Sequence, residues 1–254
     1  MTKLTVVMPC YNEGIRIYRN IIELVTQLER FCDSFRIIVV NDGSSDETES
    51  EIQRAQSIDK RVAMISYPDN KGKGYAVRRG MLASKSEYTA FLDADLELPP
   101  HLLEGFLKEA EAGTDIVIGS KMHPDSEVEY PFLRKVMSHG YFLFLKALFG
   151  LNLKDTQTGI KLFKTEKIRP VLKSMRNGGF SFDIELLAIS TKMGLSIKEM
   201  PVVVNFSRNK NDRSKIHLST VWEMVRDSFR IRMYVSKLIV RNSENKTNEA
   251  ETTQ

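Results

Sequence analysis

The sequence is poor in cysteine, histidine and tryptophan, and it contains no long uninterrupted hydrophobic run. Its 254 residues include two cysteines, four histidines and one tryptophan. Cys10 and Cys32 alone do not make a disulfide framework, and no CxxC or His-x-x-His spacing indicates a zinc site. No segment reaches the roughly 18 consecutive apolar residues of a membrane-spanning helix, and the N-terminal sequence MTKLTVVMP is too short an apolar stretch for a signal peptide. We therefore expect a reduced, cytoplasmic chain that contacts a membrane only from one side.

Two common nucleotide-binding motifs are also missing. The sequence has no GxxxxGK[ST] loop, which argues against an NTPase of the P-loop type, and no GxGxxG follows the first expected strand, which argues against a Rossmann dehydrogenase. The net charge of +4 is a mild basic excess, and we expect no nucleic-acid partner. Hydrophobic residues make up 42% of the chain, which is ample for a globular core.

Short apolar runs rich in β-branched residues alternate with segments of helical spacing in the first half of the chain. The expected strands are Leu4–Met8, Arg36–Val40, Val62–Tyr67, Tyr88–Leu92 and Asp115–Ile118. The expected helices between them are Ile15–Phe31, Asp46–Gln56, Gly74–Ser84 and Pro100–Ala112. This order predicts an α/β fold with a mostly parallel sheet flanked by helices. Such sheets bind ligands at the carboxyl ends of their strands, where five polar loops of this sequence meet.

The second half of the chain is less regular. It has expected helices at Phe132–Leu151, Phe182–Met193 and His217–Val240, with expected strands at Leu162–Phe163 and Ile197–Phe206. The intervening segments 154–161 and 207–215 have the composition of loops. We expect one domain over residues 1–241 and a disordered polar tail over residues 242–254.

Three carboxylates follow the expected strand that ends at Leu92. Asp93, Asp95 and Glu97 are spaced two positions apart, so in an extended segment they would share one side. Mg²⁺ prefers oxygen ligands and typically takes one or two carboxylates plus substrate phosphates. This spacing therefore indicates a metal site, and the alternative interpretation is a solvated acidic turn before the next helix.

Other loops at the same edge carry residues that suit a nucleotide. Asp42 follows a buried strand and could accept hydrogen bonds from a base or ribose, or could act as a turn and capping residue. Tyr11 and Glu13, after the first strand, allow the same two interpretations. Lys71 and Gly72 precede an expected helix, whose N-terminus could hold a phosphate.

Taken together, these motifs resemble those of the family 2 inverting glycosyltransferases. The sequences PCYNE, VVNDGSSDET, NKGKGYAVRRGM and FLDADLELPP match the order and spacing of that family's nucleotide-sugar half. Further on, GSKM, DTQTGIKLF, FSFDIELL and RSKIHLSTVWEMVRDSFRIR are similar to the dolichyl-phosphate glucosyltransferases and mannose synthases. The resemblance covers about residues 4–240. It implies a GT-A-type fold with a nucleotide-sugar half, 1–121, and an acceptor half, 122–241.

The resemblance also implies roles for individual residues. The resemblance implies that the nucleotide is bound by Pro9, Tyr11, Glu13, Val40, Asp42 and Ala94. It assigns Mg²⁺ or Mn²⁺ and the diphosphate to Asp93 and Asp95, with Glu97 as a third metal contact. Lys121 stands where mannose synthases carry Arg, which leaves a point charge in place of a bidentate fork. In the late basic loop the candidate contacts for the diphosphate are Arg208, Arg213 and Lys215.

The implied reaction moves a sugar from a nucleotide-sugar, with UDP-glucose favoured and GDP-mannose next, to a polyprenyl phosphate. An anionic phosphate acceptor needs positioning and no strong general base, in agreement with the lack of histidine in these motifs. Asp155 could orient the acceptor or sugar, or could only brace its loop. Three alternatives remain: a family 2 enzyme acting on a polysaccharide or protein hydroxyl, a nucleotidyltransferase, and a binding module without catalysis.

Two helices have the character of membrane-surface elements. The segment Phe132–Leu151 carries its cations on one face of a helix that is otherwise rich in Phe and Leu, which favours an interfacial helix over a core helix. Arg134 and Ser138 lie one turn apart on it, and they match the pair that relatives place near the acceptor phosphate. The expected helix His217–Val240 is also amphipathic and basic. We therefore predict a peripheral protein on the cytoplasmic face of a membrane.

Overall fold

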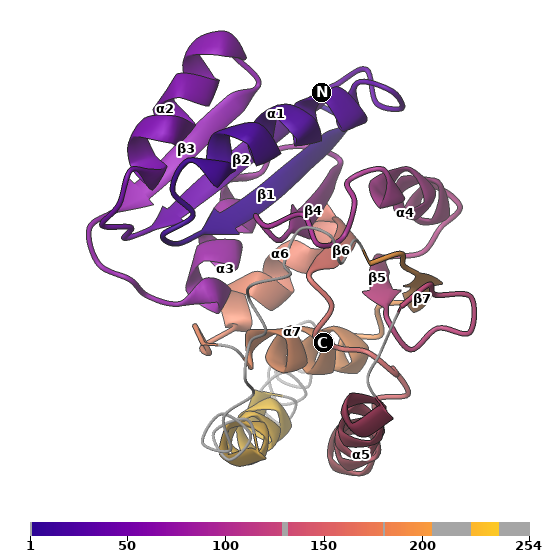
Figure 1. The fold of residues 1–254 in the computed structure, drawn as a ribbon. Coiled ribbons are helices and arrows are strands. Elements are labelled where there is room, and N and C mark those ends of the chain that lie inside the picture. Colours follow the sequence, from indigo (N-terminus) through magenta and orange to yellow (C-terminus); the bar gives the residue numbers. More distant parts are fainter. Residues whose placement is uncertain (1, 129–131, 180, 205–224, 239–254) are drawn as a thin grey trace, which may run out of the picture.

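A mixed β-sheet lies at the centre of the computed structural model, which describes residues 2–128, 132–179, 181–204 and 225–238 (Figure 1). Within these residues the sheet has seven strands in the order β3-β2-β1-β4-β6-β5-β7. β6 pairs antiparallel with β4 and β5, and the other neighbours are parallel. The strands are β1 (Leu4–Cys10), β2 (Phe35–Asp42), β3 (Val62–Tyr67), β4 (Tyr88–Leu92), β5 (Ile116–Ser120), β6 (Ile160–Lys164) and β7 (Ile197–Pro201).

Helices cover both faces of this sheet. On one face the core is built with α1 (Arg16–Leu28), α2 (Thr48–Ile58) and α4 (Leu102–Glu111). On the other face it is built with α3 (Lys73–Ala83), α6 (Thr165–Ser174) and α7 (Phe182–Lys192). The predicted α/β architecture with a mostly parallel sheet is confirmed.

The sequence pattern explains how these helices attach. In α1 the residues Ile17, Ile21, Leu24 and Leu28 recur at helical spacing and are fully buried against the sheet. Burying one such side chain contributes about 1.5–3 kcal/mol relative to leaving it in water. The same periodicity, interrupted by polar loops, is why the elements of the first half fall within three residues of their predicted bounds.

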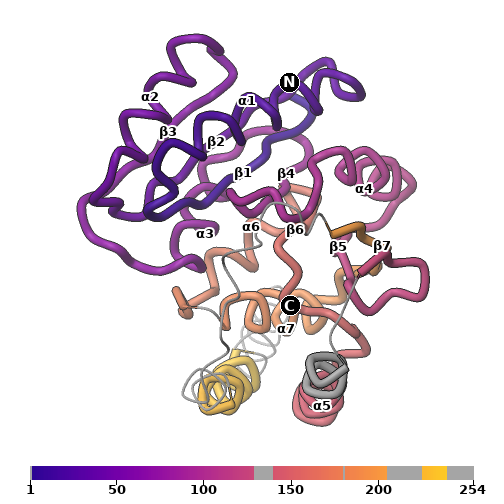
Figure 2. The backbone as a smooth tube through the Cα atoms, in the orientation of Figure 1, coloured from indigo at the N-terminus to yellow at the C-terminus, as the bar shows by residue number. Residues whose placement is uncertain are grey.

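The remaining two helices lie at one end of the molecule. α5 (Phe132–Phe149) and the helix over residues 225–238 lie below α7, away from α1 and α2 (Figures 1 and 2). Phe144 of α5 meets Phe229 edge to face, with ring centroids 5.8 Å apart, so the two helices contact each other. No helix in the described ranges is long and apolar enough to cross a membrane.

The second half departs from the sequence prediction in three places. α6 was not predicted, because Pro170 lies inside it and interrupts the pattern of a regular helix. β6 spans five residues rather than two, because the buried Lys161 belongs to the strand. The strand predicted over 197–206 ends as a regular strand at Pro201. The expected helix over 217–240 falls within the described residues only at 225–238.

Candidate active site

A cleft of about 720 Å³ opens at the carboxyl ends of β1, β2 and β4. Parallel sheets bind their ligands at this edge because the polar loops of successive strands meet there. The cleft is lined by Pro9, Cys10, Tyr11, Glu13, Asp42, Asn70, Gly72, Lys73, Ala76, Asp93, Ala94, Asp95 and Gly179. Most of the residues that the sequence assigned to the nucleotide and the metal are therefore brought together.

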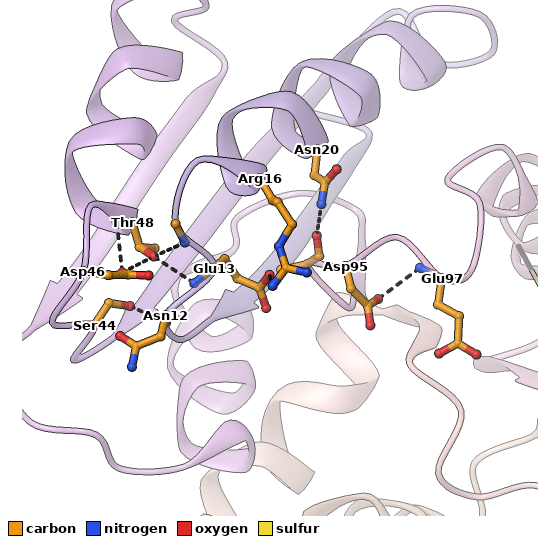
Figure 3. A network of polar contacts seen from close by, with 11 residues as sticks. Asn12, Glu13, Arg16, Asn20, Ser44, Asp46, Thr48, Asp95 and Glu97 are labelled. Carbon is orange, nitrogen blue, oxygen red and sulfur yellow. Dashed lines mark hydrogen bonds and ion pairs between the residues drawn. The ribbon is translucent and has the colours of Figure 1, made fainter. Parts of the chain in front are cut away.

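The loops after β1 and β2 are joined by a hydrogen-bond network (Figure 3). The buried Thr48 hydroxyl accepts the backbone amides of Glu13 and Gly14, each at 2.9 Å. The Asn12 amide donates to the Ser44 hydroxyl at 3.0 Å, and the Asn12 side-chain oxygen accepts the next amide along at 2.9 Å. Asn12 has a φ of 52°, in the left-handed region that Asn tolerates better than most residues. This network holds Tyr11 and Glu13 at the rim of the cleft.

Carboxyl groups concentrate on one side of the cleft. Burial raises the pKa of Glu13, the Arg16 guanidinium 3.7 Å away opposes the shift, and the charges of Asp95 and Asp93 add to it. Burial also raises the pKa of Asp95, although the hydrogen bond from the Glu97 amide at 3.0 Å partly offsets that effect. Neighbouring carboxylates that raise one another's pKa lose this repulsion when a cation binds between them. This concentration of negative charge is electrostatically suited to a cation.

The segment Asp93–Glu97 does not have the geometry that the sequence argument assumed. Asp93 to Leu96 form a turn, closed by a hydrogen bond from the Leu96 amide to the Asp93 carbonyl at 3.2 Å, and Leu96 has a φ of 51°. The extended backbone that the argument assumed is therefore absent, although Asp93 and Asp95 both line the cleft. Within the described residues no three His, Cys, Asp or Glu side chains are arranged to hold a metal ion.

Two cations pair with these carboxylates. The Lys73 ammonium lies 2.6 and 2.8 Å from the two oxygens of Asp93, and Lys121 lies 3.2 Å from Glu97. Burial lowers the pKa of Lys73, but the carboxylates of Asp93, Asp183 and Asp95 together outweigh it, and the pKa lies above its usual value. Glu97 thus pairs with Lys121, and of the three carboxylates predicted to hold a metal only Asp93 and Asp95 line the cleft.

The ion pair of Lys73 with Asp93 was not predicted. Lys73 belongs to the segment Lys71-Gly72-Lys73-Gly74, which the sequence offers as a phosphate site, and it is the first residue of α3. A cation is unfavourable at a helix N-terminus unless a nearby anion compensates it. The place of Lys73 at the start of an expected helix was therefore the sequence feature that could have indicated an anionic partner nearby.

Asp42 shapes a neighbouring loop. Its two carboxylate oxygens accept the backbone amides of Lys71 and Gly72 at 2.8 and 2.9 Å. Gly43, with a φ of 71°, allows this loop to approach, because a Cβ there would lie 2.5 Å from the Asn70 nitrogen. Asp42 therefore lines the cleft and also braces the loop that forms its wall.

Two residues that the sequence assigned to the nucleotide-sugar, Val40 from the resemblance and Lys71 from its place before a helix, lie outside the cleft lining. Val40 is fully buried, and its side chain belongs to the core beneath α3. The Lys71 ammonium lies over the rings of Tyr67 and Tyr75, at 5.4 and 5.1 Å from their centroids. Tertiary packing determines where these two side chains lie, and no pattern in the sequence indicates either location.

Asp155 is tied into its own surroundings. One of its oxygens accepts the Lys121 amide at 2.9 Å, and the other accepts the Gln157 amide at 3.2 Å. Its own amide donates to Glu199 at 2.9 Å. This arrangement is the bracing role that the sequence left open for Asp155.

Comparison with known proteins identifies the family of this site. Residues 5–172 match the model of glycosyl transferase family 2. The chain belongs to this family. It is an enzyme of the glycosyltransferase class, and the nucleotidyltransferase and binding-module interpretations are wrong.

Individual relatives resemble this glycosyltransferase over most of its length. A dolichyl-phosphate β-glucosyltransferase of Dictyostelium discoideum is 32% identical over 246 residues, which cover 90% of this chain and 73% of the relative. One from Drosophila melanogaster is 33% identical over 247 residues, covering 90% and 74%. Glucosyl-3-phosphoglycerate synthase of Mycobacterium tuberculosis, solved with Mn²⁺, UDP-glucose and phosphoglyceric acid, shares the fold with a TM-score of 0.66 at 19% identity, covering 92% and 79%. The GT-A-type fold is confirmed.

The remaining predicted site residues of the glycosyltransferase cannot be placed in the same way. Arg208, Arg213 and Lys215 lie outside the described residues, and so do the side chains of Arg134 and Ser138. The described part of α5 has two kinds of surface. Leu145 and Phe149 are buried in the core, whereas Leu143 is 52% exposed. α5 is therefore part of the core along one side and faces solvent along the other.

Proposed function

We propose that this family 2 glycosyltransferase transfers a hexose, with inversion, from a nucleotide-sugar to a polyprenyl phosphate of the dolichyl type. UDP-glucose is the favoured donor and GDP-mannose the next. The acceptor follows from relatives that are named dolichyl-phosphate β-glucosyltransferases and match about 90% of this chain. The donor follows from the motifs DTQTGIKLF and FSFDIELL, which resemble the glucosyl subgroup.

The observation that supports this proposal best is the acidic cleft at the carboxyl edge of the sheet. Asp93 and Asp95 line it from the turn after β4, next to Glu13 and Lys73. A divalent cation such as Mg²⁺ or Mn²⁺ commonly takes one or two protein carboxylates plus substrate phosphates, and this donor set fits that pattern. When bound, the cation offsets the negative charge that develops on the leaving nucleoside diphosphate.

Different residues of the chain then bind the nucleoside, the diphosphate and the acceptor phosphate. Pro9, Tyr11 and Glu13 hold the nucleoside at the rim, and Lys73 supplies a positive charge beside Asp93. The acceptor phosphate is already an anion, so positioning it against the sugar carbon is the main requirement. Residues proposed for the acceptor phosphate are Lys121, Arg134 and Ser138, and those proposed for the diphosphate are Arg208, Arg213 and Lys215.

We place the enzyme at the cytoplasmic face of a membrane as a peripheral protein, with the nucleotide-sugar half at 1–121 and the acceptor half at 122–241. Three large apolar side chains, Leu143, Phe229 and Met233, are each about half or more exposed on α5 and the helix over 225–238. Arg226 and Arg230 lie on the second helix and are largely exposed. Apolar side chains beside cations suit an anionic bilayer surface.

The test of this proposal is turnover with a defined donor and acceptor. Purified enzyme is incubated with UDP-glucose or GDP-mannose, Mn²⁺ and polyprenyl phosphate, and the glycolipid and nucleoside diphosphate are quantified. Asp95→Ala should lower kcat/KM by about 10²-fold or more, on the scale seen when electrostatic stabilisation is lost. Asp33→Ala is the matched control, because Asp33 is exposed just before β2 begins, at the opposite edge of the sheet. Full transfer without divalent metal, or transfer to a hydroxyl acceptor only, would contradict the proposal.

A further inference from the structure

A buried ion pair joins β6 to α7 behind the cleft, and neither of its residues belongs to the cleft lining. The Lys161 ammonium is fully buried and lies 2.6 Å from the Asp183 carboxylate, whose side chain is 6% exposed. Lys161 also donates to the Thr158 carbonyl at 2.7 Å and lies 5.0 Å from the centre of the Phe91 ring. Buried ion pairs add little stability relative to apolar residues of the same volume, because both charges must leave water. Stability alone therefore does not account for this pair.

The first hydrogen-bond partner of Lys161, the Thr158 carbonyl, lies in a loop that contacts Asp93. Thr158 precedes Gly159, and the Gly159 carbonyl accepts the Asp93 amide at 3.0 Å. A Cβ on Gly159 would lie only 2.1 Å from an Asp93 carboxylate oxygen, so this backbone forms the wall against which that carboxylate rests. The bond from Lys161 to the Thr158 carbonyl holds this wall in place.

The second partner, Asp183, lies in α7, which packs against the start of α3, the helix that carries Lys73. Asp183 lies in the first turn of α7, directly after Phe182. A Cβ on Gly74 would lie 2.5 Å from the Phe182 Cβ, so the start of α3 packs directly against the start of α7. Lys73, the residue before Gly74, places its ammonium on Asp93. The single buried pair thus anchors both elements that confine the Asp93 carboxylate.

We propose that Lys161 and Asp183 are positioning residues, which hold Gly159 and the start of α7 so that the Asp93 carboxylate keeps the orientation required for the metal-diphosphate donor. The proposal rests on the proposed function of the cleft. Directional hydrogen bonds fix a loop relative to a helix more narrowly than apolar contacts of the same volume do. A hydrophobic pair would fill the space but would leave the Thr158 carbonyl without its donor.

The test is the double variant Lys161→Met/Asp183→Leu, which removes both charges and keeps the volume. Thermal unfolding, and calorimetric titration with UDP in the presence and absence of Mn²⁺, are measured for each protein. We expect the melting temperature to stay within a few degrees of wild type. The Kd of UDP with Mn²⁺ should rise about 10–100-fold, the range that follows loss of a group supporting a metal ligand. The kcat for glycolipid synthesis should fall in parallel.

Lys164→Met is the matched control. Lys164 lies on the same strand, donates to the Gly113 carbonyl at 2.8 Å and lies 3.8 Å from Asp115, and neither of these partners lines the cleft. Its nucleotide affinity and turnover should equal those of wild type. Gly159→Ala provides an independent variant, since its added Cβ would displace the Asp93 carboxylate without touching the ion pair. It should weaken UDP binding with Mn²⁺ as the double variant does.

The outcomes separate this inference from the proposed function. Wild-type Kd and kcat in the folded double variant would show that the pair only fills space, and would overturn the inference. A double variant that unfolds would show a role in stability and would equally overturn it. Wild-type protein that neither binds UDP nor transfers sugar would refute the proposed function itself, before any variant is compared.

Discussion

Thr48 offers the sharpest test of how the cleft is built. It is fully buried at the start of α2, and its hydroxyl is the acceptor for the backbone amides of Glu13 and Gly14. Thr48→Val keeps the shape of the side chain and removes the oxygen. Each buried donor left without a partner costs about 1–3 kcal/mol, and because these two amides are only part-buried we expect the lower part of the summed range, a loss of about 2–4 kcal/mol of unfolding free energy. For a domain of this size that is a fall of roughly 4–16 °C in Tm.

The same variant should change the pH dependence of stability. Burial alone would raise the pKa of Asp46, but hydrogen bonds from the Thr48 hydroxyl and from backbone amides, those of Thr48 and Gly14 among them, together outweigh it and hold the pKa below its usual value. A lowered pKa in the folded state contributes stability that is present above the unfolded pKa of about 3.9 and is lost as the pH falls through the folded value. The stability difference between wild type and Thr48→Val should therefore be largest near neutral pH and should narrow below about pH 4.

Urea unfolding at several pH values, with calorimetric titration of UDP at neutral pH, measures both effects. Thr26→Val is the control, because the Thr26 hydroxyl lies on the exposed face of α1 and bonds only the Ile22 carbonyl of its own helix. UDP affinity should fall in Thr48→Val, since Tyr11 and Glu13 lose their anchor, and should be unchanged in the control. A loss below about 0.5 kcal/mol, the usual size of a neutral surface change, would refute the account of the network.

Three further predictions follow from contacts at the cleft and at the two lower helices. Asn20→Leu removes the 2.7 Å hydrogen bond from the Asn20 side chain to the Ala94 carbonyl in the turn after β4 (Figure 3). Calorimetric titration with UDP and Mn²⁺ should then show several-fold weaker binding. Unchanged binding would exclude Asn20 as a support for this turn. Asp42→Asn places a donor against two amides and should cost about 1–3 kcal/mol in urea unfolding; a stability equal to wild type would contradict the bracing role. Leu143→Ser with Met233→Ser removes exposed apolar surface and should weaken sedimentation with anionic liposomes at unchanged Tm; a fall in Tm would show these side chains to be core instead.

Local pattern was sufficient for much of the fold. β3 and β4 have the predicted bounds, because short apolar runs flanked by turn residues leave little choice of register. α6 escaped prediction because its interior Pro170 opposes helix formation locally, whereas burial of Ile168, Val171 and Leu172 in the core favours it. The antiparallel insertion of β6 between β4 and β5 is a long-range pairing, and no local signal encodes it.

The same division applies to the site. The amino-acid sequence by itself determined which loops carry the chemistry, because polar residues directly after buried strands can only gather at the carboxyl edge of a parallel sheet. Only the tertiary structure decided which carboxylates form ion pairs. The backbone turns at Leu96, Asp93 pairs with Lys73, and Glu97 pairs with Lys121. The tertiary structure also buried Lys161 against Asp183, residues 22 positions apart in the chain. Such pairings depend on how separate elements pack, and packing is settled by the whole core rather than by any one segment.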